Sequence, residues 1–270
     1  MTRLLTAAVL MPAAWYLCKR APFPLFLAAA LLLAGIGAWE CAAILRHRGS
    51  RPFAGLAVVG CLGVVGAFAL RPPLVVALGA LTAAALLAPA LAMWRRETPE
   101  AMLDAVTTTF FPLLFVGLPF AHVVGLESIP GQDGSDLLLL AMVCVTLSDS
   151  GAYYAGSLFG SRPMAPLISP KKTWEGAAGG VLGSVAGALV AHFWFFRRLS
   201  LAHALILGVV LCGAGILGDL AESALKRAAG VKDSSALLPG HGGVLDRVDS
   251  LLVAAPVLYY YWIVLIPGSS

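Results

Sequence analysis

Long uninterrupted apolar runs are the feature that most restricts how this chain can fold. Reading between charged residues and prolines gives nine runs: Leu4–Leu17, Phe23–Ile44, Ala54–Leu70, Leu74–Met93, Ala105–Leu126, Leu137–Phe159, Ala177–Phe196, Ala202–Leu225 and Ser250–Ile266. A helix needs about 20 apolar residues to cross the hydrocarbon core of a bilayer. A transmembrane barrel would instead show segments of about 10 residues with alternating hydrophobicity. The sequence therefore predicts an all-α, polytopic integral membrane protein with about nine transmembrane helices.

The composition agrees with lipid as the solvent of most side chains. Charged residues make up 12% of the chain and the mean hydropathy is +0.90, whereas soluble domains carry about 25% charged residues. The five cysteines lie in apolar runs without CxxC spacing, so we interpret them as small buried hydrophobic residues. We expect one transmembrane domain, residues 1–270, with 1–104 as scaffold helices and 105–270 as the helices that carry the function. No nucleic-acid partner is expected.

The distribution of positive charge predicts the orientation of the chain. Nine spans place the termini on opposite sides of the membrane, and the side of the N-terminus then holds 13 of the 18 lysines and arginines. Basic residues favour the cytoplasmic side. The loop Glu127–Asp136 has three acids and no base, which is consistent with the outer side. We therefore expect a multi-pass protein of the inner membrane with a cytoplasmic N-terminus, and we interpret Leu4–Leu17 as a first membrane helix rather than a cleaved signal.

Glycines and prolines punctuate the predicted spans. Arg71-Pro72-Pro73 separates two of them, because proline cannot continue a helix interior. Glycines recur at small-xxx-small spacing in Gly176–Gly187, which is typical of helices whose backbones approach closely. Gly151 and Gly156 are expected to break the span that contains Asp149.

The segment Ser223–Asp249, called the signature segment below, is the main polar exception. It contains four basic residues, three carboxylates and His241 between two apolar runs. A charge held at bilayer depth costs about 2.5–3.5 kcal/mol on insertion scales, so such a cluster indicates a functional role. We predict that this segment borders a polar cavity open to the cytoplasm.

Four acids lie in or at the edge of predicted spans: Glu40, Asp149, Asp219 and Glu222. Ionisable residues within a membrane are candidates for functional sites. Asp219 and Glu222 share one helix face with Lys226, because their spacing is i, i+3, i+7. We interpret Glu40 as structural or close to the interface. For Asp149, a functional role and a structural carboxylate bonded to neighbouring hydroxyl groups remain equally open.

Two further carboxylates, Asp246 and Asp249, lie three residues apart at the start of the last span. Like charges this close repel each other unless a cation lies between them. Mg²⁺ characteristically takes one or two carboxylates together with substrate phosphates. The alternative is that Asp246 caps the helix and Arg247 pairs with a neighbour. Capping explains only one of the two acids, so we favour metal ligation.

Basic residues and glycines in the signature segment indicate a phosphate-binding site. The stretch Pro239-Gly240-His241-Gly242-Gly243 allows the backbone to approach a ligand closely. The helix N-terminus that follows it is expected to offer free N–H groups to an anion. Four positive charges surround this stretch, enough to hold a polyphosphate: Lys226, Arg227, Lys232 and Arg247.

A second basic cluster, Ser169–Gly176, precedes the seventh span. Ser169 followed by Pro170 is typical of a helix start. Taken alone, Lys171 and Lys172 would be read as positive-inside anchors. Because they lie on the same side of the membrane as the signature segment, we interpret them as phosphate contacts.

At these residues the chain resembles the phosphatidate cytidylyltransferases, also called CDP-diacylglycerol synthases. Their pattern is, in outline, Ser-x-apolar-Lys-Arg, four residues, Lys-Asp, and then Pro-x-His-Gly-Gly-apolar-x-Asp-Arg-apolar-Asp. Ser223–Arg227, Lys232-Asp233 and Pro239–Asp249 fill every fixed position. Asp149–Tyr153 and Ser169–Gly176 are also similar to the family. Before Asp149 only the hydropathy matches.

The resemblance implies that the protein transfers CMP from CTP to phosphatidic acid in phospholipid biosynthesis, giving CDP-diacylglycerol and pyrophosphate. It implies a Mg²⁺-dependent reaction, with a second, monovalent cation and a homodimer as further expectations. The expected metal ligands and catalytic carboxylates are Asp219, Asp246 and Asp249, and Lys226 is expected to be catalytic through contact with the phosphates. The expected substrate contacts are Lys171, Lys172, Ser169, Arg227, Lys232, His241, Arg247, Asp149 and Glu222.

Two other functions fit parts of the same pattern. A CTP-dependent polyprenol kinase would transfer the γ-phosphate instead of CMP. A secondary transporter would use intramembrane acids to relay protons or sodium. Transporters often carry corresponding broken helices in two halves, whereas this chain concentrates its polar chemistry after Asp149. We therefore favour nucleotidyl transfer.

Overall fold

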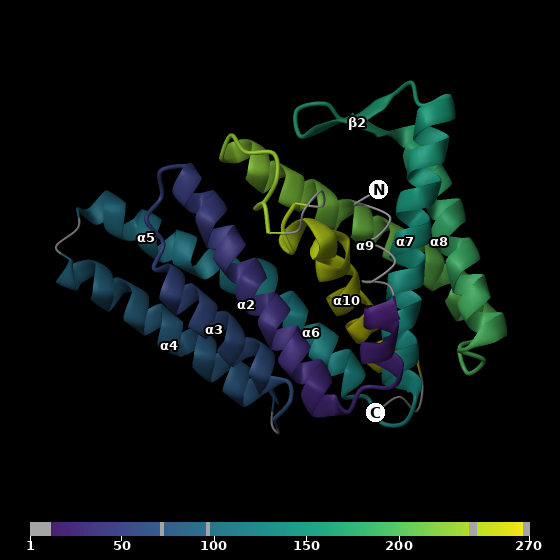
Figure 1. Ribbon diagram of the computed structural model, residues 1–270, viewed down its shortest axis with the longest axis horizontal. Coiled ribbons are helices and arrows are strands. Elements are labelled where there is room, and N and C mark those ends of the chain that lie inside the picture. The colour runs from purple at the N-terminus through teal and green to yellow at the C-terminus, as the bar shows by residue number, and fades with distance from the viewer. Residues whose placement is uncertain (1–11, 71–72, 96–97, 238–241, 267–270) are drawn as a thin grey trace. The chain divides into compact units, whose positions relative to one another are not determined.

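The computed structural model describes residues 12–70, 73–95, 98–237 and 242–266, and these residues are mainly helical (Figure 1). Residues 12–19 form a helical stretch. The helices that follow are α2 (Phe23–His47), α3 (Ala54–Ala67), α4 (Pro73–Trp94), α5 (Pro99–Pro112), the π-helix η1 (Leu113–Gly117), α6 (Leu118–Glu127), α7 (Asp133–Phe159), α8 (Trp174–Trp194), α9 (Leu201–Ala228) and α10 (Leu245–Leu265). The strands are β1 (Pro163–Ala165) and β2 (Ser169–Thr173).

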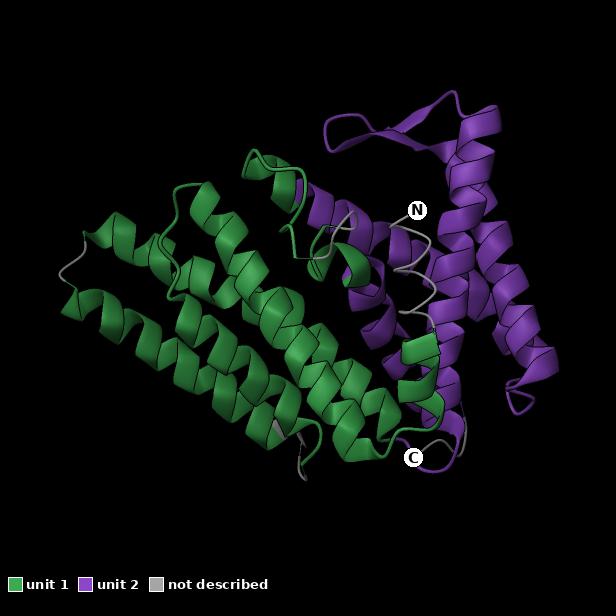
Figure 2. Ribbon diagram, viewed as in Figure 1, with its two compact units in different colours: residues 1–128, 225–248 green, residues 129–224, 249–270 purple. Residues whose placement is uncertain are grey.

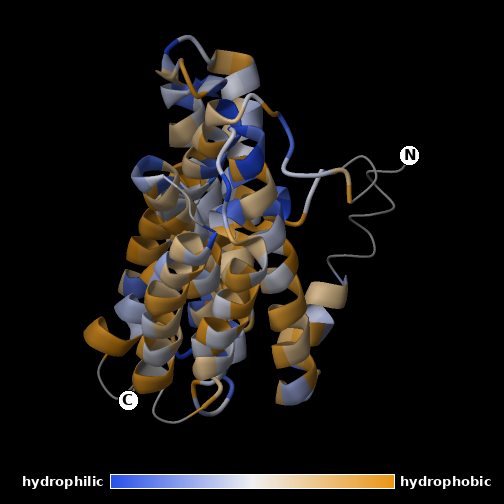
Figure 3. Cartoon of the chain, turned by 90° about the vertical axis from the view of Figure 1, so that its left-hand side faces the viewer, coloured by the Kyte–Doolittle hydropathy of each residue, from blue (hydrophilic) through white to orange (hydrophobic). Residues whose placement is uncertain are grey.

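Among the described residues, seven helical runs are long and apolar enough to cross a membrane, and α3 is a shorter apolar helix. Orange, hydrophobic residues recur along the helices, interspersed with paler ones (Figure 3). The prediction of an all-α, polytopic membrane protein is therefore confirmed. The run Pro99–Glu127 combines α5, η1 and α6 in one continuous segment. The first predicted span, Leu4–Leu17, lies mostly outside the described residues.

The contacts divide the chain into two compact units, shown in Figure 2. Unit 1 comprises Met1–Ser128 and Leu225–Val248, and unit 2 comprises Ile129–Ala224 and Asp249–Ser270. The division passes through α9 and α10, so most of the signature segment belongs with the N-terminal helices. Each unit is described by itself below.

Small residues form the helix contacts of unit 1. One buried cluster consists of Ala38, Ala57, Cys61, Ala84 and Leu113, and another consists of Phe53, Ala88, Ala92 and Ala105. Helices in lipid gain little from burying apolar surface against each other, so close backbone packing of small residues is what holds them together. Polar bonds add to this packing, because Ser50 Oγ donates to Asp104 Oδ1 over 2.9 Å and ties the loop before α3 to α5.

In unit 2, glycines allow the backbones of α7 and α8 to pack closely against each other. A Cβ atom at Gly183 would overlap the carbonyl of Leu147, and one at Gly151 would overlap the carbonyl of Gly179. The close approach predicted for the glycines of Gly176–Gly187 is confirmed. The predicted break at Gly151 and Gly156 is wrong, because α7 continues from Asp133 to Phe159. These glycines make room for the neighbouring backbone and do not interrupt the helix.

An antiparallel hairpin, β1 with β2, precedes α8 and pairs Pro163 with Thr173 and Ala165 with Ser169. The prediction that Ser169-Pro170 starts a helix is therefore wrong. The helix starts at Trp174, where Thr173 Oγ1 accepts a bond of 3.1 Å from the Gly176 amide. A threonine hydroxyl at this position satisfies an amide that the first helical turn leaves open, so the N-cap decides the helix boundary.

Candidate active site

A cavity of about 300 Å³ in unit 2 gathers several of the predicted site residues. Its lining combines basic residues of β2 with acids from α7 and α9: Ser148, Asp149, Ala152, Tyr153, Met164, Lys171, Lys172, Thr173, Gly176, Ala177, Ile216 and Asp219. The hairpin therefore brings the second basic cluster of the sequence to the intramembrane acids. Lys171 and Lys172 thus line the same cavity as Asp149 and Asp219, while their contact with phosphates stays a prediction.

Lys172 and Asp219 form an ion pair in the wall of this cavity. The Lys172 Nζ atom lies 2.5 Å from Asp219 Oδ2, and the two side chains are 25% and 32% exposed. The other carboxylate oxygen of Asp219 accepts a bond of 3.2 Å from Ser223 Oγ, one turn further along α9. Both oxygens of Asp219 are thus oriented, and its charge is balanced by a cation at the edge of the cavity.

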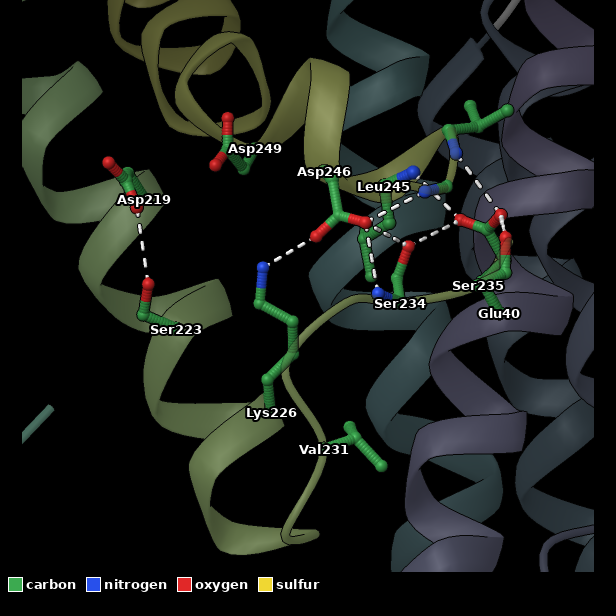
Figure 4. A network of polar contacts seen from close by, with 12 residues as sticks. Glu40, Asp219, Ser223, Lys226, Val231, Ser234, Ser235, Leu245, Asp246 and Asp249 are labelled. Atoms are coloured by element: carbon green, nitrogen blue, oxygen red, sulfur yellow. Dashed lines mark hydrogen bonds and ion pairs between the residues drawn. The ribbon is translucent and has the colours of Figure 1, made fainter. Parts of the chain in front are cut away.

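Asp249 lies close to Asp219 along the contact between α9 and α10 (Figure 4). A Cβ atom at Gly218 would overlap the Asp249 carbonyl, so the two backbones touch at the residue next to Asp219. Asp249 Oδ1 also accepts a bond of 2.6 Å from the Ser250 amide. Two carboxylate residues therefore adjoin at one helix contact within unit 2.

The predicted Mg²⁺ site does not have a complete set of protein ligands among the residues that the structure describes. In the described part of the chain, no three His, Cys, Asp or Glu side chains are grouped closely enough to hold a metal ion. Carboxylate oxygens are nevertheless the donors that Mg²⁺ prefers, and Mg²⁺ commonly takes only one or two of them together with substrate phosphates. The donor chemistry of Asp219 and Asp249 fits such an ion without a third protein ligand already in place.

Asp246 is the centre of a second polar cluster, in unit 1 (Figure 4). Its Oδ1 atom lies 2.5 Å from Lys226 Nζ, and the side chains are only 6% and 12% exposed. Its Oδ2 atom accepts bonds from the Ser234 amide (2.9 Å), the Ser234 hydroxyl (2.9 Å) and the Gly243 amide (2.8 Å). Gly242 has a φ of +76°, which favours glycine. The signature segment therefore wraps around this carboxylate.

Glu40 of α2 binds the same segment from the N-terminal part of unit 1. Its side chain is buried, with 3% exposure, and its carboxylate accepts bonds from the amides of Val244 (3.1 Å) and Leu245 (2.8 Å). The prediction that these N–H groups are free for a phosphate is therefore wrong. Two carboxylates of the chain itself, Glu40 and Asp246, occupy the amino end of α10.

Sequence comparisons with known proteins show the family of the chain. A sequence profile of the cytidylyltransferase family matches residues 1–265. The chain belongs to the cytidylyltransferase family. It is 37% identical over 268 residues to a phosphatidate cytidylyltransferase of Pseudomonas aeruginosa, and the alignment covers 94% of each chain.

Shorter alignments relate the chain to two further proteins that are also named phosphatidate cytidylyltransferase. The protein of Haemophilus influenzae is 45% identical over 137 residues, which are 49% of this chain and 48% of that one. The protein of Mycobacterium bovis is 39% identical over 168 residues, which are 62% of this chain and 53% of that one. The chain thus spans about half the length of these two relatives.

The remaining predicted site residues have diverse surroundings. Glu222 is fully buried in α9, with 0% exposure. Ser169 is half-buried at the start of β2. Three basic residues of the signature segment are exposed: Arg227, Lys232 and Arg247. Arg227 donates from Nη1 to the Val231 carbonyl over 3.3 Å. His241 lies outside the described residues.

Glu40 is the residue whose contacts the sequence did not predict. It was assigned a structural or interfacial position, without a partner. Its partners Ser234 and Leu245 follow it by 194 and 205 residues, so no local spacing connects them. The available signal was the acid itself, because a carboxylate within an apolar helix requires polar partners.

Proposed function

We propose that this protein transfers CMP from CTP to phosphatidic acid, giving CDP-diacylglycerol and pyrophosphate. The observation that carries the proposal is the ion pair between Lys172 and Asp219 at the wall of the unit 2 cavity. It joins the basic cluster Ser169–Gly176, which resembles the family, to an acid of α9 that lies far from it in the sequence. The family match over residues 1–265 supports the same activity.

The reaction needs alignment and charge neutralisation more than it needs a strong base. A phosphate oxygen of phosphatidic acid attacks the α-phosphorus of CTP, a new P–O bond forms there, and the bond to the bridging oxygen of the β-phosphate breaks. The attacking oxygen is already anionic near neutral pH. Lys171 and Lys172 line a cavity in which cationic groups can orient phosphates and stabilise the charge on departing pyrophosphate.

We propose that Mg²⁺ takes part, held by Asp219 and Asp249 together with phosphates of CTP. Asp246, whose oxygens accept bonds from Lys226, Ser234 and Gly243, is the third predicted ligand. A bound Mg²⁺ neutralises phosphate charge and orients the reacting oxygens. Within the chain, Lys172 and Ser223 fix the two oxygens of Asp219. A second, monovalent cation remains a prediction.

We also propose that the protein resides in the inner membrane with this chemistry on the cytoplasmic side. The apolar helices and the excess of basic residues on the side of the N-terminus support this orientation. The acyl chains of phosphatidic acid would then stay in the leaflet while its phosphate meets CTP. A homodimer and the lack of a nucleic-acid partner remain predictions.

Label transfer tests the proposal directly. Purified protein in detergent is supplied with phosphatidic acid and with CTP labelled at the α- or the γ-phosphate, with and without EDTA. We expect lipid labelled only from α-labelled CTP, and no labelling when EDTA removes Mg²⁺. Lipid labelled from γ-labelled CTP would indicate a lipid kinase instead. Labelling from α-labelled CTP that persists in EDTA would contradict only the proposed role of Mg²⁺ and would leave the transfer of CMP supported.

A further inference from the structure

We propose that Glu40 is a positioning residue of this enzyme. Its carboxylate holds the signature segment in the shape that directs Asp246 towards Lys226. The inference rests on the proposed function, because it concerns how efficiently that reaction proceeds. It assigns a role to a residue of α2, far in sequence from the signature segment.

The bonds of Glu40 account for both of its oxygens (Figure 4). Oε1 accepts from Ser235 Oγ (2.6 Å) and from the Val244 amide (3.1 Å). Oε2 accepts from Ser234 Oγ (3.1 Å) and from the Leu245 amide (2.8 Å). One carboxylate thus binds the signature segment at two places: at Ser234 and Ser235, which follow α9, and at the Val244 and Leu245 amides, where α10 starts.

A carboxylate suits this position better than any other side chain. Two amides and two hydroxyl groups lie within hydrogen-bond distance of its two oxygens. A glutamine would offer only one acceptor oxygen, and its amide hydrogens would face donors. The amino end of α10 also favours negative charge, because its exposed N–H groups carry partial positive charge. The helix N-terminus therefore favours the negative charge of Glu40, whose hydrogen-bond donors among the described residues are hydroxyl and amide groups.

Ser234 connects Glu40 to Asp246. Its hydroxyl oxygen lies 3.1 Å from Glu40 Oε2 and 2.9 Å from Asp246 Oδ2. The single hydroxyl hydrogen can be donated to only one of them at a time. The consecutive amides of Gly243, Val244 and Leu245 are divided between the same two carboxylates. Displacing Glu40 therefore displaces the groups that orient Asp246.

Gly243 provides independent evidence that the segment is closed around Glu40. A Cβ atom at this position would overlap Ser234 Oγ and the Glu40 carboxylate. No side chain can be accommodated while both groups keep their places. The glycine is thus explained by the packing of the segment against Glu40.

The decisive experiment compares Glu40→Gln with Asp104→Asn in the full-length enzyme. Asp104 is a matched control, because it also clamps a loop of unit 1, through Ser50 Oγ (2.9 Å) and the Arg51 amide (3.3 Å), and has no bond to the described residues of the signature segment. We expect Glu40→Gln to lower kcat by about 10- to 100-fold, the scale on which misplaced catalytic groups act. The KM for CTP should change by less than about threefold, since the loss falls on the transition state.

Amide hydrogen exchange supplies a readout independent of turnover. Glu40→Gln should accelerate exchange at Val244 and Leu245, whereas Asp104→Asn should leave both amides protected and kcat close to that of the wild type. An unchanged kcat in folded Glu40→Gln, or an equal loss of kcat in Asp104→Asn, would overturn the proposal. If Glu40→Gln does not fold, Ser234→Ala and Ser235→Ala carry the test, and wild-type kcat in both would overturn it.

The two proposals fail in different ways. An inactive wild-type enzyme would refute the proposed function, while the exchange comparison would still report whether Glu40 protects the amides of α10. An active wild-type enzyme with an unaffected Glu40→Gln variant would refute only the positioning role.

Discussion

At the scale of single residues, the ion pair of Asp219 offers the sharpest test. Asp219→Asn leaves one acceptor oxygen and removes the charge that balances Lys172, so we expect turnover to fall by about 100-fold or more, as when a group that stabilises transition-state charge is lost. The measurement is the rate of CDP-diacylglycerol formation at saturating CTP, with the thermal unfolding temperature in detergent as a check on folding.

Asp133 is the matched control for Asp219. It belongs to the same unit and pairs with Arg198 at the same N–O distance of 2.5 Å, but it does not line the cavity. Arg198 is 63% exposed, and exposed ion pairs contribute little to stability. Asp133→Asn should therefore retain activity within about twofold of the wild type. A comparable loss of activity in both variants would show that Asp219 acts through stability only.

The site residues differ in how far the sequence could predict them. Asp219 and Lys226 are separated by two helical turns, so helix periodicity alone placed them on one element. Lys172 was predicted as a phosphate contact, but its pairing with Asp219 depends on the hairpin. The contacts of Glu40 depend on tertiary folding entirely, because its partners lie at the other end of the chain. Local spacing carries information only over a few turns.

At the scale of elements, the contact between α7 and α8 allows a stability prediction. Gly183→Ala would force its Cβ atom against the Leu147 carbonyl, and overpacking of this kind costs about 1–3 kcal/mol. Gly213 in α9 is the control, since a Cβ atom there meets no atom within 4 Å. Gly213→Ala should be neutral or stabilising, by up to about 1 kcal/mol. Thermal unfolding in detergent measures both, and equal unfolding temperatures would contradict the assignment.

The errors in predicting elements have a common physical origin. Gly151 and Gly156 were expected to break a helix, but in a membrane the backbone hydrogen bonds of a helix are hard to replace, so the helix continues and the glycines serve packing. Ser169-Pro170 was expected to begin a helix, but the N-cap bond of Thr173 fixes the start four residues later. In both cases hydrogen bonding of the helix backbone outweighed the local preference of a glycine or of a Ser-Pro pair.

At the scale of the whole molecule, the spans were predictable because the constraint is strong. A backbone in lipid must satisfy its polar groups internally, so an apolar run of sufficient length has few alternatives to a helix. The helices α2, α4 and α7 accordingly begin or end within a few residues of the predicted spans. The division into two units was not predictable in the same way, since it depends on contacts between residues distant in the chain.

The orientation of the chain can be tested by cysteine labelling. The cysteines of the described residues are all buried, so a variant with alanine at Cys18, Cys41, Cys61, Cys144 and Cys212 provides a background without reactive thiols. Gln132→Cys and Ala236→Cys are then introduced singly at exposed positions, the first in the acidic loop and the second in the signature segment.

Because basic residues stay cytoplasmic, a membrane-impermeant maleimide should label Gln132→Cys in intact spheroplasts and Ala236→Cys only after lysis. Labelling of both variants in detergent shows that each thiol is accessible. The opposite pattern in spheroplasts would place the signature segment outside, where CTP is not supplied by the cell, and would contradict both the orientation and the proposed use of CTP. The charge asymmetry of 13 against five basic residues makes the expected pattern a strong consequence of the sequence.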